Sequence, residues 1–402
     1  MSRPIKILHA LGTLNPGGVE VWLLSLLKSL DTKQFQFDFC TLGSEAGLYA
    51  RDAQGLGAVI HRCPRFPIYS LGRRFRQILR QGQYDVVHSH VHLFSGALLR
   101  WAQTEKVPVR IAHSHASHDD NSDRPLRRYY RRLMQGCIQR HSTHGLAASQ
   151  IAGKELFAGA WQQDHRFRVL HYGIDLARFQ SAFSKDQIRK ELGIPIDAPV
   201  VGHVGRFVKA KNHHFLLKIA AEILKLRPDI HFLLVGDGHL KDEIEEQSRA
   251  MRISPNVHFP GARNDIPRLM QGCMDAFVLP SLWEGFGLVL IEAQAAGLPC
   301  TLSDSISEET SVFHQRIFRL PLSKDAKEWA MVIINSLALR HLTSDETLST
   351  LDQTDFSIRQ SSAMLTQLYA GATQTLPNLN LNEVEPPLQP STNQNSLGPS
   401  IE

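Results

Sequence analysis

The sequence predicts an α/β protein built from two parallel-sheet domains, and three observations support this fold class. Short apolar segments that favour β-strands alternate with helical segments along most of the chain, as in parallel sheets covered by helices on both faces. With 402 residues the chain is long enough for two hydrophobic cores. Near residues 180–198 a polar stretch containing Pro195, followed by Pro199, interrupts the alternation and indicates a domain boundary.

The expected elements follow from apolar runs and from the residues that begin and end helices. In the first half we expect strands at 5–11, 35–42, 84–88, 109–112 and 145–148, and helices at 19–30 and 93–103. In the second half we expect strands at 200–204, 230–235, 257–259 and 276–279, and helices at 213–226, 240–251, 265–271 and 288–296. A last helix is expected at 356–369.

These elements divide the chain into four parts. The predicted parts are an N-terminal domain at 1–182, a C-terminal domain at 183–355, the last helix within 356–372, and a tail at 373–402. The tail is rich in Pro, Asn, Gln and Ser and has no periodicity. That composition cannot bury enough apolar surface to fold, so the tail is predicted to be disordered.

Composition indicates a reduced, cytosolic protein. No apolar run approaches the roughly 20 residues that a membrane helix needs, and the first residues lack the apolar core of a signal peptide. The five cysteines include no Cys-x-x-Cys pair, so neither a disulfide framework nor a zinc site is supported.

The net charge of +5 is unevenly distributed. Residues 1–180 carry 24 basic and 13 acidic side chains, whereas residues 181–402 carry 20 and 26. One predicted helix in the basic half has Leu126, Tyr129, Tyr130 and Leu133 among six arginines, which are Arg124, Arg127, Arg128, Arg131, Arg132 and Arg140. Such a helix can lie on an anionic membrane or form an ordinary solvated face, and periodicity alone favours the second. No helix-turn-helix, zinc or RNA-recognition pattern supports nucleic-acid binding.

The most informative segment is residues 280–292, with the sequence PSLWEGFGLVLIE. It joins the carboxyl end of a buried strand to the N-terminus of a helix, where open α/β sheets bind ligands and anions. Glu284 and Glu292 bracket the loop. In a continuous helix eight residues would span roughly 12 Å, wider than the roughly 5 to 9.5 Å of a glycosidase carboxylate pair. The spacing suits two contacts on one long ligand, such as a nucleotide-sugar.

This segment resembles the Glu-x7-Glu motif of retaining family-four glycosyltransferases of the GT-B fold. Three further matches follow the family's order: the Gly17–Glu20 glycine loop, the Tyr172–Asp175 hinge with Phe179, and Gly205-Arg206 with Lys211-Asn212-His213. The resemblance covers about residues 4–370, and the part from Leu269 to Pro299 is similar to enzymes of bacterial exopolysaccharide clusters. It implies two Rossmann-like domains facing across a cleft, with the last helix crossing back to the first domain.

The resemblance also implies roles for individual residues. Arg206 and Lys211 would hold the donor diphosphate, with Lys209 as a local rival of Lys211. Fixed positive charge there would stabilise the negative charge that develops on the leaving diphosphate. Further diphosphate contacts are expected from Gly17, Gly18, Phe286, Gly287 and Leu288. Glu284 is a catalytic-site residue, Glu292 binds the ribose, and Gly236, Asp237 and Gly238 lie near the base.

Some of these segments also have structural interpretations that the sequence leaves open. The two glycines can form a plain βα turn, Glu20 can complement the helix dipole, and Asp237 can be a helix-entry residue. The loop containing Ser303, Asp304, Glu308 and Glu309 matches the family's donor-facing loop only loosely. Gly12 and Gly17 lack the G-x-G-x-x-G spacing, which argues against a nicotinamide dehydrogenase.

Histidines are dense in the first half, at positions 88, 90, 92, 113, 115 and 118. No acidic ligands accompany them, so a metal site is not predicted. In the family a histidine after a strand of this domain contacts the transferred sugar. The segment Ala112-His113-Ser114-His115 departs from the family's commoner Thr-x-His pattern. We assign the role to His115 and keep His113 as the rival.

The sequence therefore predicts a retaining hexosyltransferase that needs neither cofactor nor metal. Its expected partners are a nucleotide-diphosphate sugar and a glycan or lipid-linked acceptor, with peripheral contact to the inner face of an anionic membrane. The sequence does not identify the sugar, the base, the acceptor or the oligomeric state. A nucleotide-sugar epimerase or a phosphorylase on the same fold, and a non-catalytic sugar-nucleotide-binding protein, are the alternatives.

Overall fold

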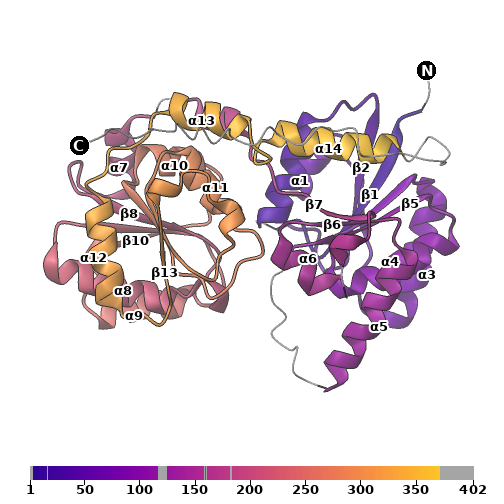
Figure 1. Ribbon diagram of the computed structural model, residues 1–402, viewed down its shortest axis with the longest axis horizontal. Coiled ribbons are helices and arrows are strands. Elements are labelled where there is room, and N and C mark those ends of the chain that lie inside the picture. Colours follow the sequence, from indigo (N-terminus) through magenta and orange to yellow (C-terminus); the bar gives the residue numbers. More distant parts are fainter. Residues whose placement is uncertain are drawn as a thin grey trace, which may run out of the picture.

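The computed structural model describes residues 3–15, 17–115, 125–157, 159, 161–181 and 183–371. Two lobes lie side by side, each with a twisted sheet between layers of helices (Figure 1). The N-terminal lobe has a seven-stranded sheet in the order β3-β2-β1-β4-β5-β6-β7, and the C-terminal lobe a six-stranded sheet in the order β10-β9-β8-β11-β12-β13. Every described pairing is parallel, which confirms the predicted fold class.

In the N-terminal lobe the central strands are almost fully buried, because helices cover both faces of the sheet. The strands are β1 (Ile5–Leu11), β2 (Phe35–Thr41), β3 (Ile60–Arg62), β4 (Val86–Ser89), β5 (Val109–Ser114), β6 (His144–Ala147) and β7 (Phe167–Val169). The helices are α1 (Gly18–Ser29), α2 (Ala50–Gly55), α3 (Ile68–Gly82), α4 (Ser95–Thr104), α5 (Pro125–His141) and α6 (Gln150–Leu156).

The C-terminal lobe repeats this arrangement around β8 and β11. Its strands are β8 (Val200–Val204), β9 (His231–Val235), β10 (Val257–Gly261), β11 (Ala276–Leu279), β12 (Cys300–Ser303) and β13 (Ile317–Leu320). Its helices are α7 (Lys185–Leu192), α8 (His213–Leu226), α9 (Lys241–Ala250), α10 (Ile266–Gly272), α11 (Leu288–Ala295), α12 (Ala326–Ser336) and α13 (Ser344–Asp352).

The last helix, α14 (Ile358–Ala370), lies on the N-terminal lobe, so the chain crosses between the lobes twice (Figure 1). It packs on α1, where Trp22 Nε1 donates to Ser361 Oγ at 3.4 Å and the hydroxyls of Ser29 and Ser362 are 2.7 Å apart. The crossing helix inferred from the resemblance is thus present. The predicted tail at 373–402 and Arg124 lie outside the described residues.

The two crossings pair with each other, and we call the paired segments, residues 172–175 and 356–358, the hinge. Ile174 N donates to Phe356 O at 2.8 Å, and Ile358 N donates to Ile174 O at 3.0 Å. A Cβ atom on Gly173 would lie 2.3 Å from Ser357 O, so only glycine lets the segments approach this closely. None of the described helices is long and apolar enough to span a membrane.

Candidate functional site

Two helix N-termini, one from each lobe, meet between the sheets. Helix α1 begins at Gly18 and α11 at Leu288, and a Cβ atom on Gly18 would lie 3.8 Å from Leu288 Cβ. The N-cap residues Gly17 and Gly287 provide no side-chain cap. First-turn N–H groups and both helix dipoles therefore favour an anion at this junction.

The C-terminal lobe adds two cations beside this junction, in the loop after β8. Arg206 is exposed, whereas Lys211 is half-buried and its Nζ lies 2.6 Å from Glu284 Oε1. Ser281 Oγ also donates to that oxygen at 2.6 Å. Among the described residues Lys211, and not Lys209, reaches Glu284. The structure thus brings together the Lys211 and Glu284 predicted from separate motifs.

Backbone contacts hold the loops after β8 and β11 against each other. Leu282 N donates to Ala210 O at 2.7 Å, and Asn212 Nδ2 donates to Pro280 O at 3.1 Å. Asn212 adopts a left-handed conformation with φ of 55°, which asparagine tolerates well. Lys211 and Glu284 are therefore positioned by one backbone and one side-chain hydrogen bond at the carboxyl edge of the sheet, where ligands bind in open α/β folds.

The Gly236–Gly238 turn lies directly beside the Arg206 segment. Its two glycines have φ values of 146° and 156°, and Cβ atoms on them would lie 2.0 Å from Gly205 O and 2.5 Å from Phe207 O. Phe207 N donates to Asp237 O at 2.9 Å. The glycines are required by this close backbone contact, which keeps the turn at the same edge of the sheet as the cations.

Phe286 and Glu292 lie deeper between the lobes. The Phe286 ring is 3% exposed and packs against Tyr172, with 5.3 Å between ring centroids. Only the backbone of Phe286 is therefore available to a phosphate, so the predicted diphosphate contact of this residue is limited to its backbone N–H. Glu292 and Leu288 face a small interlobe cavity that Trp22 and Arg178 also line. Burial raises the pKa of Glu292 to about 7, and the Arg178 charge partly opposes this rise.

Five histidines in or directly after β1, β4 and β5 form a group at the carboxyl edge of the first sheet, in which His9, His88 and His113 are buried and His90 and His115 are half-buried. His9 Nδ1 lies 3.0 Å from His90 Nε2, His90 Nδ1 lies 2.7 Å from His115 Nε2, and His115 bonds to the Tyr172 hydroxyl. A second chain runs from His113 through His88, 3.1 Å apart, to the Tyr369 hydroxyl at 2.8 Å. Burial lowers the pKa of all five, so the rings are neutral near pH 7.

The two candidate histidines differ in position. His113 is fully buried, with its ring edge-on to Trp22. His115 is half-buried, and its partner Tyr172 contacts Phe286 of the opposite lobe. His113 thus contacts α1 directly and His115 is linked to the opposite lobe through Tyr172, so the choice between them stays a prediction.

The histidine group offers two sets of potential metal ligands. The ring nitrogens of His9, His88 and His90 lie within 4.8 Å of one another, as do those of His90, His113 and His115. In each set one pair of rings is already hydrogen-bonded, His9 with His90 and His90 with His115, and no carboxylate belongs to either set. Absence of a catalytic metal remains a prediction. The sequence analysis missed His9, whose register opposite His88 only strand pairing reveals.

Glu309 lies at a contact between the lobes that the sequence did not specify. His171 Nε2 lies 3.1 Å from Glu309 Oε2, and its Nδ1 lies 3.6 Å from Asp355 Oδ2. Burial alone would lower the pKa of His171, but hydrogen bonds with Asp355 and Glu309 raise it to about 9. Glu309 also accepts from Gln150 N at 3.1 Å, and Ser149 Oγ donates to Gly285 O at 3.0 Å. Hydrogen bonds thus join the loops containing Gly285 and Glu309 to the N-terminal lobe.

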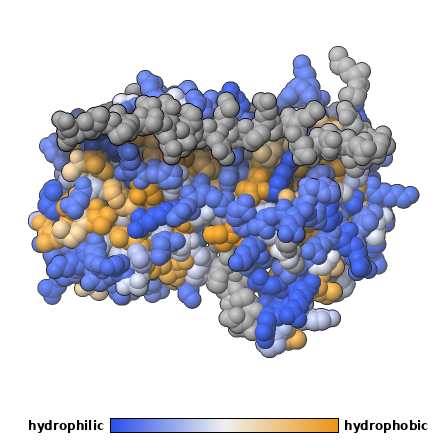
Figure 2. All heavy atoms as spheres, viewed as in Figure 1, coloured by the Kyte–Doolittle hydropathy of each residue, from blue (hydrophilic) through white to orange (hydrophobic). Residues whose placement is uncertain are grey.

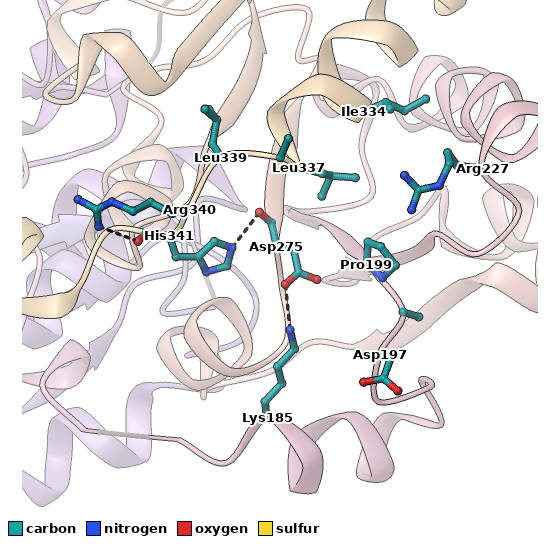
Figure 3. Close-up of a pocket in the computed structure, with 12 residues that line it drawn as sticks. Lys185, Asp197, Pro199, Arg227, Asp275, Ile334, Leu337, Leu339, Arg340 and His341 are labelled. Carbon is teal, nitrogen blue, oxygen red and sulfur yellow. Dashed lines mark hydrogen bonds and ion pairs between the residues drawn. The ribbon is translucent and has the colours of Figure 1, made fainter.

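A separate cavity of about 430 Å³ lies on the C-terminal lobe, near the residues that precede β8 and β11 (Figure 3). Lys185, Asp275, Arg340 and His341 line it, and Lys185 Nζ lies 3.1 Å from Asp275 Oδ1. Because it lies at the amino ends of these strands, it is remote from the junction of α1 and α11.

Two Rossmann-like lobes with cations and helix N-termini at their junction define a two-lobed α/β protein suited to an anionic ligand. The family model described as Glycosyltransferase Family 4 matches residues 16–178, and that described as Glycosyl transferases group 1 matches residues 184–334. A Bacillus subtilis (strain 168) protein that carries the name glycosyltransferase EpsF is 33% identical over 378 residues, covering 92% of this chain and 97% of that protein. The chain belongs to the family-four glycosyltransferases of the GT-B fold.

Two further comparisons agree with this assignment. An Escherichia coli protein, UDP-Gal:alpha-D-GlcNAc-diphosphoundecaprenol alpha-1,3-galactosyltransferase, is 30% identical over 237 residues, covering 57% of this chain and 60% of that protein. The crystal structure of Anabaena HepE in complex with UDP-glucose superposes with a TM-score of 0.73 at 20% identity, covering 91% of this chain and 100% of that chain. At this identity the similarity to HepE supports the fold alone.

Proposed function

We propose that this glycosyltransferase moves a sugar from a nucleotide-diphosphate sugar to a glycan or lipid-linked acceptor, with retention, in exopolysaccharide or related surface-glycan synthesis. One observation carries the donor assignment: Arg206 and Lys211 lie where the uncapped N-termini of α1 and α11 meet. A diphosphate is an anion that suits this combination of cations and N–H groups.

The relatives support the finer parts of this proposal. HepE has been solved with UDP and with UDP-glucose, which favours a uridine-diphosphate sugar as the first donor to test. The acceptor in the name of the Escherichia coli relative is a sugar-diphosphoundecaprenol, which favours a lipid-linked acceptor. Retention rests on the family resemblance of the 280–292 segment, and the pathway rests on the similarity of residues 269–299 to enzymes of bacterial exopolysaccharide clusters.

In this proposal Arg206 and Lys211 stabilise the charge that develops on the leaving diphosphate. Glu284 contacts the transferred sugar, Glu292 the ribose and the 236–238 turn the base, while His115 approaches the sugar from the N-terminal lobe. The family's usual account is same-face attack assisted by the leaving phosphate, which needs no protein nucleophile. Movement at the hinge would exclude water and favour transfer over hydrolysis.

The test is a panel of nucleotide-sugars, including UDP-glucose, UDP-galactose and UDP-N-acetylglucosamine, assayed for slow hydrolysis and for protection against thermal unfolding. One donor should stand out in both measurements, and its sugar should then pass to GlcNAc-diphosphoundecaprenol or a glycan with its anomeric configuration kept. An epimerase would release the isomeric nucleotide-sugar without acceptor. A binding protein would be stabilised without turnover.

We further propose that the N-terminal lobe docks on an anionic membrane surface through α5. The apolar side chains of Leu126, Tyr129 and Leu133 occupy one stripe of this helix and are 86%, 71% and 51% exposed. Arg128 and Arg132 are also exposed. The helix projects from the body of the lobe (Figure 1), and mainly hydrophilic side chains surround its few apolar ones (Figure 2). Exposed apolar residues beside arginines are typical of interfacial helices.

A further inference from the structure

Glu20 has no task in the function proposed above, although it stands three residues after Gly17 in the first turn of α1. Its carboxylate folds back over the loop that precedes the helix, because a Cβ atom on Gly17 would lie 2.5 Å from Glu20 Oε2. Glycine at position 17 therefore leaves the space that this carboxylate occupies, directly beside the junction of α1 and α11.

The Glu20 side chain is half-buried, and among the described residues it lacks a side-chain partner. Burial raises the pKa of Glu20 to about 7, while its own backbone N–H and the charge of Arg206 act against that rise. In the described part of the chain no ion pair and no hydrogen bond from another side chain reaches it. A half-buried carboxylate without such partners is costly to stability, which is typical of groups kept for ligand binding.

The position of Glu20 restricts the ligand group that it can bind. Glu20 lies two residues after Gly18, where a Cβ atom would be 3.8 Å from Leu288 Cβ of the opposite lobe, and Arg206 of that lobe is near enough for its charge to lower the pKa of Glu20. The carboxylate therefore lies at the junction of the two lobes. A diphosphate bound by Arg206 would repel Glu20, since like charges at short range disfavour each other. A hydroxyl group, in contrast, donates a strong hydrogen bond to a carboxylate. The partner that fits is a neutral sugar hydroxyl approaching from the side of the N-terminal lobe.

We propose that Glu20 accepts a hydrogen bond from a hydroxyl group of the acceptor sugar and thereby orients the acceptor against the donor. The inference rests on the proposed glycosyl transfer and adds a residue to its acceptor side. In the proposed function Arg206, Lys211 and Glu284 hold the donor from the C-terminal lobe, and the glycine loop before α1 adds only backbone N–H groups, which leaves the Glu20 side chain to the acceptor.

The test compares Glu20→Gln with the wild-type enzyme and with Glu246→Gln, an exposed glutamate on α9. Glutamine can still bond to the backbone at the start of a helix, as glutamate does in a capping box, so a purely structural Glu20 would tolerate this change. Three quantities are measured with full-length protein: UDP affinity, UDP-sugar hydrolysis without acceptor, and transfer to GlcNAc-diphosphoundecaprenol.

We expect Glu20→Gln to lower kcat/KM for the acceptor by roughly 10-fold or more, the usual effect of losing a charged hydrogen bond to a ligand. UDP should bind Glu20→Gln as tightly as wild type or more tightly, and UDP-sugar hydrolysis should stay within about 3-fold of the wild-type rate. Glu246→Gln should match wild type in UDP affinity, hydrolysis and transfer. Unchanged transfer, or a parallel loss of UDP binding and hydrolysis, would overturn the acceptor role. A wild-type enzyme that neither binds UDP nor turns over any donor would overturn the proposed function itself.

Discussion

At the scale of single residues, the cations of the site already face carboxylates. Lys211 contacts Glu284 directly, and Arg206 lies near enough to Glu20 to oppose the rise in its pKa. A bound diphosphate would replace these partners with a stronger one, because phosphate oxygens accept several charge-assisted hydrogen bonds. Both side chains are then best placed to act on the leaving group.

Replacing either cation with alanine should therefore reduce turnover. For Arg206→Ala and Lys211→Ala we expect kcat to fall by about 100-fold or more, on the scale of roughly 3 kcal/mol for one lost transition-state donor. Steady-state kinetics with the preferred nucleotide-sugar measures this. Lys209→Ala is the matched control and should keep wild-type turnover. Wild-type rates in both Arg206→Ala and Lys211→Ala would contradict the diphosphate assignment.

The histidine group gives a second prediction. If Arg206, Lys211 and the helix N-termini replace a divalent cation, transfer should continue at an unchanged rate in excess chelator. The assay compares the dialysed enzyme with and without EDTA. Loss of activity that Mg²⁺ or Mn²⁺ restores would show that a metal is needed after all, and the two histidine sets would be the first ligands to test.

His171 gives a third prediction, about stability and pH. Its folded pKa of about 9 lies above the unfolded value of roughly 6.5. The stabilisation from Glu309 and Asp355 is thus fully present below about pH 6.5 and is lost as pH rises through about 9. The difference in melting temperature between wild type and His171→Gln should shrink over that window. His314→Gln, at an exposed histidine, should show no such trend.

Candidate site residues within linear motifs could be predicted from the sequence, whereas those that only the fold brings together could not. Lys211 and Glu284 each follow a strand, so both were expected at one edge of the sheet. His9 was missed because its neighbours His88 and His90 are about 80 positions away and meet it only through strand pairing. Motif spacing carries no information about such contacts.

At the scale of elements, buried apolar strands inside the sheets were predicted well, and three partly buried edge strands were missed. Strands β1, β8 and β11 have the predicted bounds, because each is a continuous apolar run in a buried parallel sheet. Strands β3, β7 and β13 have only three or four residues and were not predicted. Helix α3 was also missed, although Leu71, Phe75 and Leu79 recur every four residues as in an amphipathic helix.

The arginines of α5 differ in how available their charges are to a membrane surface. Arg131 Nη2 lies 2.7 Å from Glu155 Oε1, so its charge is engaged within the lobe, whereas Arg128 and Arg132 are exposed. Each arginine near an anionic surface contributes about 1 kcal/mol, within a Debye length of the membrane. Charge reversal at Arg128 and Arg132 should therefore weaken binding without disturbing the fold.

Vesicle flotation tests the predicted docking of α5 on an anionic membrane, which is the fourth prediction. Wild type should float with vesicles containing anionic lipid, less at high salt, and Arg128→Glu with Arg132→Glu should reduce recovery severalfold. Arg249→Glu, on exposed α9 of the other lobe, is the control. Equal recovery with neutral vesicles would contradict an electrostatic contribution, and no binding at low salt would contradict docking.

At the scale of the whole molecule, the hinge joins the lobes through backbone pairing and a cluster of rings. Tyr172 links the histidine group to Phe286, and the adjacent His171 packs on Phe286 with 5.4 Å between ring centroids. Residues 171–174 therefore contact the candidate site on both lobes while pairing with residues 356–358. Any movement of the lobes must either preserve this pairing or break it. The close backbone contact at Gly173 limits how far the paired segments can shift.

Gly173→Ala should test this, because a Cβ atom would lie 2.3 Å from Ser357 O and 2.4 Å from Ile358 N. Both are backbone atoms, so the 356–358 segment and the start of α14 must shift rather than a flexible side chain. We expect the unfolding free energy to fall by about 1–3 kcal/mol, measured by urea titration. We also expect faster proteolysis near residue 357, measured by limited digestion. Gly55→Ala, in α2 with no atom within 4 Å of the new Cβ, should change stability by less than about 1 kcal/mol. Equal stability and equal digestion of the two variants would show that the crossing helix does not depend on the close approach at Gly173.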